Sequence, residues 1–118
     1  MTSRLEGLDL ARRAVDAATE KQASDTILLD VTGFCSFADY FVITTGESGR
    51  QLGAIFDEIE HVLKQEGAAP IYREGTSDSG WMVLDYGDVI VHIFAPAERA
   101  FYNLEELWGA GRAVLRMQ

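Results

Sequence analysis

The sequence predicts a single α/β domain in which a mixed β-sheet of about five strands is flanked by helices. A chain of 118 residues is long enough for one domain and leaves no room for a second core. Hydrophobic residues make up 47% of the chain and charged residues 25%, which is typical of globular proteins. The predicted elements follow the order helix, strand, strand, helix, three strands and helix, without a repeat or a linker. We therefore treat residues 1–118 as one domain.

The first half of the chain is predicted to contain one amphipathic helix and two strands. From residue 8 to about residue 22, apolar side chains recur at steps of three and four residues, the period of a helix with one buried face. Residues 26–31 and 40–45 are short runs rich in aliphatic side chains, and they are followed by Gly33 and Gly46. Both runs are predicted strands.

A second helix is predicted between Ser48 and Gly67. Ser48 and Gln51 have the spacing of a capping box, which satisfies free N–H groups at the start of a helix. The apolar residues that follow trace one helical stripe: Leu52, Ile55, Phe56, Ile59, Val62 and Leu63. Residues 70–73 are a short strand candidate, and residues 75–80 are dense in turn-forming side chains.

The next two strands are predicted to form a hairpin. Residues 81–86 and 89–94 flank Gly87 and Asp88, and glycine tolerates the positive φ of a tight turn. Pro96 then ends the pairing because it lacks an N–H group.

The C-terminal part is expected to be one or two helical turns and a tail. Residues 98–108 fit a short helix with a break near Asn103, and Gly109 ends it. No pattern is recognisable further on. We therefore expect the core of the domain to span about residues 6–109, with residues 110–118 as a flexible tail.

The charge of the chain favours a basic protein as its partner. Ten Lys and Arg against nineteen Asp and Glu give a formal net charge of −9, which repels nucleic acid and anionic membranes. A basic protein, such as a ribosomal protein, is attracted by the same field. The alternative is that the acidity only keeps a small domain soluble.

Signals of catalysis or of a bound metal or cofactor are weak. Residues 46–49 connect a strand to a helix but lack the spacing of a phosphate-binding loop and include a glutamate, so a structural turn is favoured. The carboxylate pairs Asp85 with Asp88 and Glu58 with Glu60 are read as solvated acids rather than as ligands of a metal ion. We expect no catalytic residue, metal or cofactor.

The single cysteine and the two histidines are also expected to be structural. Cys35 lies between Phe34 and Phe37 with no histidine nearby in the sequence, so a buried thiol is favoured over a nucleophile. His92 alternates with apolar residues in a strand, so we expect a half-buried side chain bonded to a neighbour, with an interface role as the alternative. No histidine pair or cluster suits a metal ion.

The chain is expected to act in the cytoplasm. Its first residues lack the apolar core of a signal peptide, and no stretch reaches the roughly 20 apolar residues needed to cross a membrane. A bacterial cytoplasm is favoured over an organelle.

Two stretches of the chain resemble the ribosomal silencing factor family, which is also called RsfS or Iojap-like. The first is DYFVITTG at residues 39–46, followed by Ser48 and Arg50-Gln51. The second is stronger and matches in order and spacing at Glu74-Gly75, Gly80-Trp81, LDYGDVIVHIF (residues 84–94), Arg99, FYNLE (residues 101–105) and Leu107-Trp108. The resemblance covers about residues 6–109, so it is more than one short motif.

This resemblance implies a fold related to nucleotidyltransferases but without their catalytic acids. It implies a protein that binds the large ribosomal subunit through its fourteenth ribosomal protein, at the face that meets the small subunit. Translation would then be silenced by steric obstruction of subunit joining when nutrients are short. Members of the family are expected to be homodimers when free and monomers on the ribosome.

Carried onto this sequence, the resemblance implies a set of partner-binding residues: Trp81, Leu84, Asp85, Tyr86, Asp88 and Glu74. Trp81 is expected to be the apolar anchor, and the three acids are expected to meet Lys or Arg. Strand alternation places Trp81 and Asp85 on one face and Tyr86 on the other.

Two alternatives remain at the level of the sequence. One is a nucleotidyltransferase-like enzyme that uses residues 46–48, with Asp85 and Asp88 holding a metal ion. The other is a dimeric adaptor whose partner is not ribosomal. Nucleotide binding would distinguish the first from a silencing factor, and binding to large subunits would distinguish the second.

Overall fold

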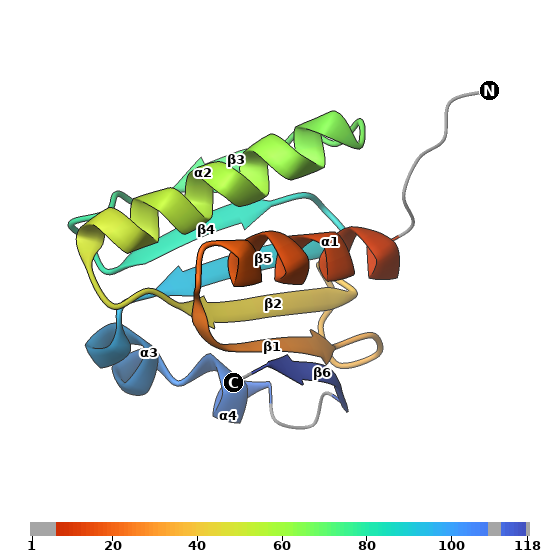
Figure 1. Cartoon of the computed structure of the whole chain (residues 1–118). Coiled ribbons are helices and arrows are strands. Elements are labelled where there is room, and N and C mark those ends of the chain that lie inside the picture. The colour runs from red at the N-terminus through yellow and green to blue at the C-terminus, as the bar shows by residue number, and fades with distance from the viewer. Residues whose placement is uncertain (1–6, 109–111, 118) are drawn as a thin grey trace.

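The computed structural model describes residues 7–108 and 112–117. These residues form a six-stranded sheet with four helices, and the strand order is β3-β4-β5-β2-β1-β6 (Figure 1). The elements in chain order are α1 (Gly7–Glu20), β1 (Ser24–Asp30), β2 (Tyr40–Thr45), α2 (Gly49–Gln65), β3 (Tyr72–Glu74), β4 (Trp81–Asp85), β5 (Val89–Phe94), α3 (Pro96–Tyr102), α4 (Leu104–Leu107) and β6 (Arg112–Met117). The predicted α/β class with a mixed sheet is confirmed.

The sheet is built from two antiparallel hairpins joined by a parallel pair. β1 pairs with β2 and β4 pairs with β5, both antiparallel, while β2 and β5 run parallel in the centre. The predicted hairpin at Gly87 is confirmed: Gly87 has a φ of 89°, and its N–H donates to the Asp85 carboxylate at 2.8 Å. The short strand β3 then extends the sheet beyond β4.

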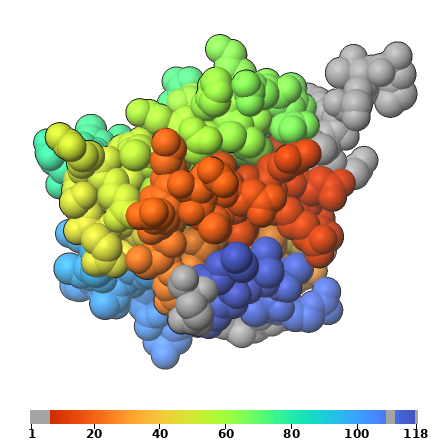
Figure 2. Space-filling view, in the orientation of Figure 1, coloured from red at the N-terminus to blue at the C-terminus, as the bar shows by residue number. Residues whose placement is uncertain are grey.

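Two long helices cover one face of the sheet. In Figure 1, α1 and α2 lie side by side across the front of the strands, and Figure 2 shows their side chains making up much of that surface. Aliphatic side chains fill the space between them and the sheet; Leu28, Val42, Leu84, Val91 and Ile93 from the strands are fully buried there. No helix in the described residues is long and apolar enough to cross a membrane.

The opposite face of the sheet has a different cover. The strands place a second group of buried side chains there, including Phe41, Ile43, Ile90 and Phe94. Leu104 of α4 packs on this group, and so does Cys35, whose predicted burial is confirmed. Asn103 separates α3 from α4 with a φ of 48°, so the predicted break in the C-terminal helical region is confirmed.

The turn between β2 and α2 has the predicted cap. The Ser48 hydroxyl accepts from the Gln51 N–H at 3.1 Å, and the Gln51 side-chain oxygen accepts from the Glu47 N–H at 2.7 Å. The Gln51 side chain also donates to the carbonyls of Lys21 and Gln22, which follow α1. Gln51 therefore both caps α2 and fixes the end of α1 beside it.

The predicted tail at residues 110–118 is wrong for residues 112–117, which form β6; residues 110, 111 and 118 lie outside the described residues. The outer edge of β1 is open to pairing, and β6 satisfies its backbone groups in an antiparallel ladder. Val114 and Leu115 pack against the helix-side core. Arg112 pairs with Asp30 at 3.1 Å, and Arg116 pairs with Asp25 at 3.2 Å. This strand also brings the number in the described sheet to six rather than about five.

Candidate functional site

Strand β4 sends its side chains to the two faces of the sheet in turn. Met82 and Leu84 point toward α1 and α2, whereas Trp81 and Val83 pack on the opposite face. Asp85 is paired across the ladder with Ile90, which belongs to that opposite face. The predicted placement of Trp81 and Asp85 on one face is therefore confirmed.

Trp81 is half-buried among other rings. Its indole stacks on Phe94 at a centroid separation of 5.0 Å and contacts the ring of Tyr102 at 4.5 Å. Such offset contacts between rings are favourable beyond the area they bury. The outer part of the indole remains accessible, since Trp81 and Tyr102 both line an open hollow of about 330 Å³ on this face.

His92 lies beneath Trp81 and holds its indole N–H. The Trp81 Nε1 donates to the His92 Nδ1 at 3.2 Å, and the His92 ring packs at 5.1 Å from the ring of Phe41. Burial lowers the pKa of His92 to about 4, so the ring is neutral at neutral pH and can accept this bond. The predicted histidine bonded to a neighbour is confirmed, although His92 is fully buried rather than half-buried.

Further rings are partly exposed on the same side of the sheet as Trp81. Tyr102 is 46% exposed, Tyr72 is 54% exposed and Phe37 is 60% exposed. Trp108 packs edge-on against Phe37 and against the buried Phe41, with centroid separations of 6.0 and 5.5 Å. We call the residues Phe37, Tyr72, Trp81, Tyr102 and Trp108 the aromatic face. Aromatic side chains that are partly exposed and rigidly packed are typical of protein-binding surfaces.

Acidic side chains lie beside the aromatic face. Glu74 lines the hollow with Trp81 and accepts a hydrogen bond from the Tyr72 hydroxyl. That hydrogen bond and the negative charge of Glu74 raise the pKa of Tyr72. Asp85 lies across the ladder from Tyr72. A ring surface with carboxylates at its margin is complementary to a partner that carries Lys or Arg.

The other predicted binding residues lie away from the aromatic face. Leu84 is 0% exposed in the helix-side core, so its side chain does not reach the surface where a partner contact is predicted. Tyr86 packs against the same core, and burial of its hydroxyl raises its pKa. Asp88 is exposed and lines a cavity with Tyr86 near the start of α1. Leu84, Tyr86 and Asp88 therefore do not form one site with Trp81.

Two glycines before Trp81 are needed for its position. Gly75 has a φ of 88°, and a Cβ there would clash with the Trp81 carbonyl oxygen. Gly80 has a φ of 78°, and a Cβ there would clash with the side chain of Glu98 on α3. Both backbones are in the region that favours glycine. The turn at residues 75–80 thus brings β3, β4 and α3 together around Trp81.

The described residues also show what occupies the sites considered for catalysis. In the first turn of α2 the Gln51 N–H is taken up by the Ser48 cap, and Glu47 accepts from the Ser24 hydroxyl at 3.3 Å. The predicted structural turn at residues 46–49 is confirmed. Within residues 7–108 and 112–117, no three His, Cys, Asp or Glu side chains are grouped so that they could hold a metal ion.

Comparison with known proteins identifies the family. The model of the family described as "Ribosomal silencing factor during starvation" matches residues 4–117. The chain belongs to the RsfS family. The RsfS of Bacillus subtilis is 42% identical over 96 residues, which are 81% of each chain. The RsfS of Halalkalibacterium halodurans is 40% identical over 101 residues, which are 86% of each chain.

A crystal structure supports the same relationship. The structure of a protein from Chromobacterium violaceum superimposes with a TM-score of 0.86 and is 32% identical in sequence. The alignment covers 89% of this chain and 88% of the other. The RsfS resemblance proposed from the sequence is therefore confirmed over nearly the whole domain.

Sequence reasoning missed several members of the aromatic face in this RsfS chain. Phe37 and Tyr72 stand outside the motifs, and Tyr102 and Trp108 lie within them but were not selected as site residues. Alternation along β3 would have placed Tyr72 and Glu74 on one face. No pattern along the chain brings Phe37 next to Trp108, because that contact depends on how the loop before β2 folds over the sheet.

Proposed function

We propose that this protein silences ribosomes without being an enzyme. It acts in the cytoplasm, binds the large ribosomal subunit through its fourteenth ribosomal protein, and obstructs joining of the small subunit when nutrients are limiting. Membership of the RsfS family supports the silencing role. The observation that carries the proposal is the aromatic face, which offers a partner a packed set of rings.

The aromatic face offers a basic ribosomal protein both contact area and complementary charge. Trp81 is held by Phe94, Tyr102 and His92, so it loses little freedom on binding. Glu74 lines the hollow with Trp81, and Asp85 lies across the ladder from Tyr72, in a chain with a net charge of −9. The rings would supply contact area and the acids would steer and orient a cationic partner. Obstruction then needs only the volume of the bound domain.

The same face would be covered by a second copy when the protein is free. Exposed rings in one patch are costly to leave in water, and a symmetric dimer buries the same patch twice. In our proposal the free protein is a homodimer and the ribosome-bound form is a monomer. Binding to the ribosome and dimerisation then compete for the aromatic face.

Cosedimentation with purified large subunits tests this proposal. We expect the wild type to bind and to prevent joining when small subunits are added. Trp81→Ala should weaken binding by about 2 kcal/mol or more, roughly thirtyfold in Kd. Ile71→Ala is the matched control, because Ile71 is 75% exposed but lies near Gly87, away from the aromatic face.

Three results would contradict the proposal. Failure of the folded wild type to bind large subunits would mean that its partner is not the large ribosomal subunit. Equal binding by Trp81→Ala would remove the aromatic face from the interface. A large rise in melting temperature on addition of Mg²⁺ and a nucleotide would favour an enzyme, since a ligand at 100 times its Kd adds about 2.7 kcal/mol.

A further inference from the structure

Arg99 is an unusual residue in this fold. It lies in α3, its side chain is only 9% exposed, and it is the one buried charged residue among those the structure describes. A buried charge is costly unless it is paired and hydrogen-bonded. The contacts of Arg99 must therefore compensate for the burial of its charge.

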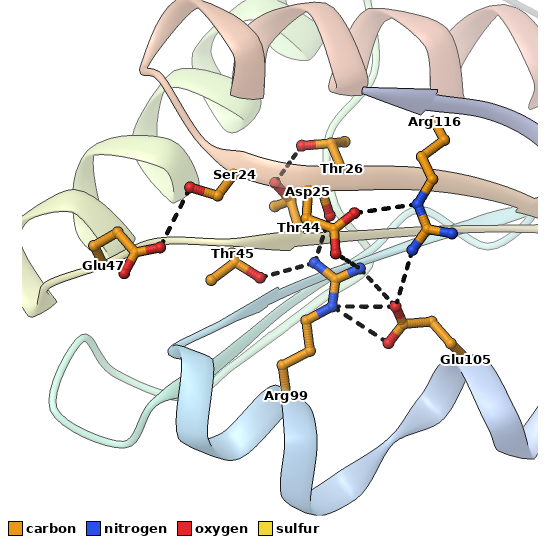
Figure 3. A network of polar contacts seen from close by, with 9 residues as sticks. All are labelled: Ser24, Asp25, Thr26, Thr44, Thr45, Glu47, Arg99, Glu105 and Arg116. Carbon is orange, nitrogen blue, oxygen red and sulfur yellow. Dashed lines mark hydrogen bonds and ion pairs between the residues drawn. The ribbon is translucent and has the colours of Figure 1, made fainter. Parts of the chain in front are cut away.

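The guanidinium of Arg99 is surrounded by oxygen atoms of its own chain (Figure 3). Its Nη1 donates to the Thr45 hydroxyl at 2.7 Å and to the backbone carbonyl of Asp25. Its Nη2 donates to the Glu105 carboxylate at 2.7 Å, and its Nε lies 3.3 Å from both oxygens of that carboxylate. The donors thus bind the chain itself, which argues against a site for an external anion.

These contacts connect elements that are distant in the sequence. Asp25 belongs to β1, Thr45 ends β2 and Glu105 lies in α4, so Arg99 joins α3 to three other elements. Arg116 of β6 extends the network, with 3.2 Å to the Asp25 carboxylate and 3.7 Å to that of Glu105. Figure 3 shows both arginines converging on the same two acids.

The backbone of Asp25 is shaped to serve this contact. Asp25 has a φ of 45°, a left-handed conformation that is uncommon for residues other than glycine, asparagine and aspartate. The register between β1 and β2 also shifts between Ser24 and Ile27. The carbonyl that this irregular stretch presents is the one that accepts from Arg99. The left-handed backbone at Asp25 therefore presents its carbonyl oxygen to the Arg99 guanidinium.

Arg99 lies in the same short helix as Tyr102, and α4 connects that helix to Trp108. Tyr102 lies one turn after Arg99 in α3 and packs on Trp81, while Trp108 follows α4 and packs on Phe41. α3 has seven residues and α4 has four, and helices this short are not stable alone. The bond from Arg99 to Glu105 spans the break between them at Asn103.

We propose that Arg99 is a positioning residue for partner binding: its guanidinium fixes α3 and α4 on the sheet and thereby places Tyr102 on Trp81 and Trp108 on Phe41. This inference rests on the function proposed above. Arginine is required because its planar group reaches Thr45, Asp25 and Glu105 at once, whereas the single ammonium of lysine cannot.

The test uses Arg99→Lys in the full chain, with Arg13→Lys as the matched control. Arg13 pairs with Glu66 at 3.5 Å on the helix side and is 51% exposed. Amide hydrogen exchange of the free protein and affinity for purified large subunits are both measured. For Arg99→Lys we expect exchange in α3, α4 and β6 to become about tenfold faster, and Kd to rise about tenfold, since losing a charged hydrogen bond has at least that effect. Exchange in α1 and α2 should stay unchanged, and Arg13→Lys should match the wild type.

A second variant keeps the test decisive if Arg99→Lys does not fold. Glu105→Gln preserves size and one acceptor oxygen but removes the charge, so it should show the same local pattern to a smaller degree. Unchanged exchange in α3 and α4, or faster exchange spread evenly over α1 and α2, would overturn the positioning role. So would local loosening with unchanged affinity. If the wild type itself does not bind large subunits, the proposed function fails, whereas the exchange pattern still decides whether Arg99 places α3 and α4.

Discussion

The two faces of the sheet differ in chemistry and in how they are covered. The face under α1 and α2 is aliphatic and closed, with Leu84 and Val91 fully buried. The opposite face carries rings and one histidine, and its cover leaves Tyr102 and Phe37 about half exposed. Helices of 14 and 17 residues close the first face, whereas helices of seven and four residues lie on the second. We therefore expect the side under α1 and α2 to contribute most to stability and the opposite side to contribute most to binding.

Polar contacts replace apolar packing where the cover is thin. The short helices α3 and α4 are held by Arg99 and its oxygen partners, while α1 and α2 are held by buried aliphatic side chains. A polar network specifies one geometry, because its bonds are directional. An aliphatic core supplies more free energy, because burial scales with area.

The largest expected effect is a difference in stability between variants of two neighbouring residues of β4. Leu84→Ala should lower the free energy of unfolding by about 2–5 kcal/mol, because it leaves a cavity in the helix-side core. Val83→Ala should cost less stability, because Val83 lies on the opposite side of the sheet and is only half-buried. Urea unfolding of both variants measures the difference.

Binding should follow the opposite order. Under conditions where both variants remain folded, Leu84→Ala should bind large subunits like the wild type and Val83→Ala should bind more weakly. A loss of binding by folded Leu84→Ala would show that the helix-side core also shapes the interface, which would break the division between the two faces.

The next effect is a dependence of stability on pH. The pKa of His92 is about 4 in the fold against 6.5 when exposed, so the unfolded chain binds a proton that the native state rejects. The contribution of His92 is intact above about pH 6.5 and is lost as the pH falls toward 4, by on the order of 3 kcal/mol. Urea unfolding at several pH values measures this loss.

His92→Asn is the comparison for that measurement. Its side-chain oxygen is attached to Cγ, as Nδ1 of histidine is, so it can still accept from the Trp81 indole, and it does not titrate. The difference between wild type and variant isolates His92 from the carboxylates, which titrate in both. If wild type and variant differ in free energy of unfolding by the same amount at pH 7 and at pH 4, protonation of His92 does not affect stability in this range.

A smaller effect is expected for a ring at the border of the aromatic face. Tyr102→Ala should weaken binding to large subunits by about 1–2 kcal/mol, because it removes the ring that supports Trp81. Phe101→Ala removes a neighbouring ring that is 80% exposed and should have less effect. Equal losses would indicate that the interface extends over the outer side of α3.

The smallest effect concerns the exposed ion pair between Arg112 and Asp30. Arg112 is 80% exposed, so Arg112→Ala should change the free energy of unfolding by less than about 1 kcal/mol. Thermal unfolding at low and high salt measures this. A larger loss would mean that β6 depends on the charge rather than on its backbone ladder with β1.

Much of the fold was predictable because local signals agreed with it. The stripe from Leu52 to Leu63, the cap formed by Ser48 and Gln51, and the turn at Gly87 each appear in the structure as predicted. The break at Asn103 was also predicted from the sequence. In each case the interaction lies within a few residues of the chain, so the sequence pattern contains it.

The parts that were missed depend on contacts across the fold. β6 has few buried side chains, and it forms because β1 offers a free edge and acids for its arginines. Leu84 was expected in the interface because the family resemblance carries over the whole segment Leu84-Asp85-Tyr86, although alternation buries Leu84 on the other side. The role of Arg99 needs Asp25, Thr45 and Glu105 together, and no local pattern joins them.

Both edges of the sheet resist the addition of another strand. β3 is only three residues long and exposes Tyr72, Arg73 and Glu74, while the outer strand β6 exposes Arg112 and Arg116. A very short edge strand, such as β3, and exposed charges on an edge strand, as in β6, both disfavour pairing with a neighbouring molecule. The chain should therefore withstand crowding at high concentration without forming extended β-aggregates, and association between copies would be confined to the faces of the molecule.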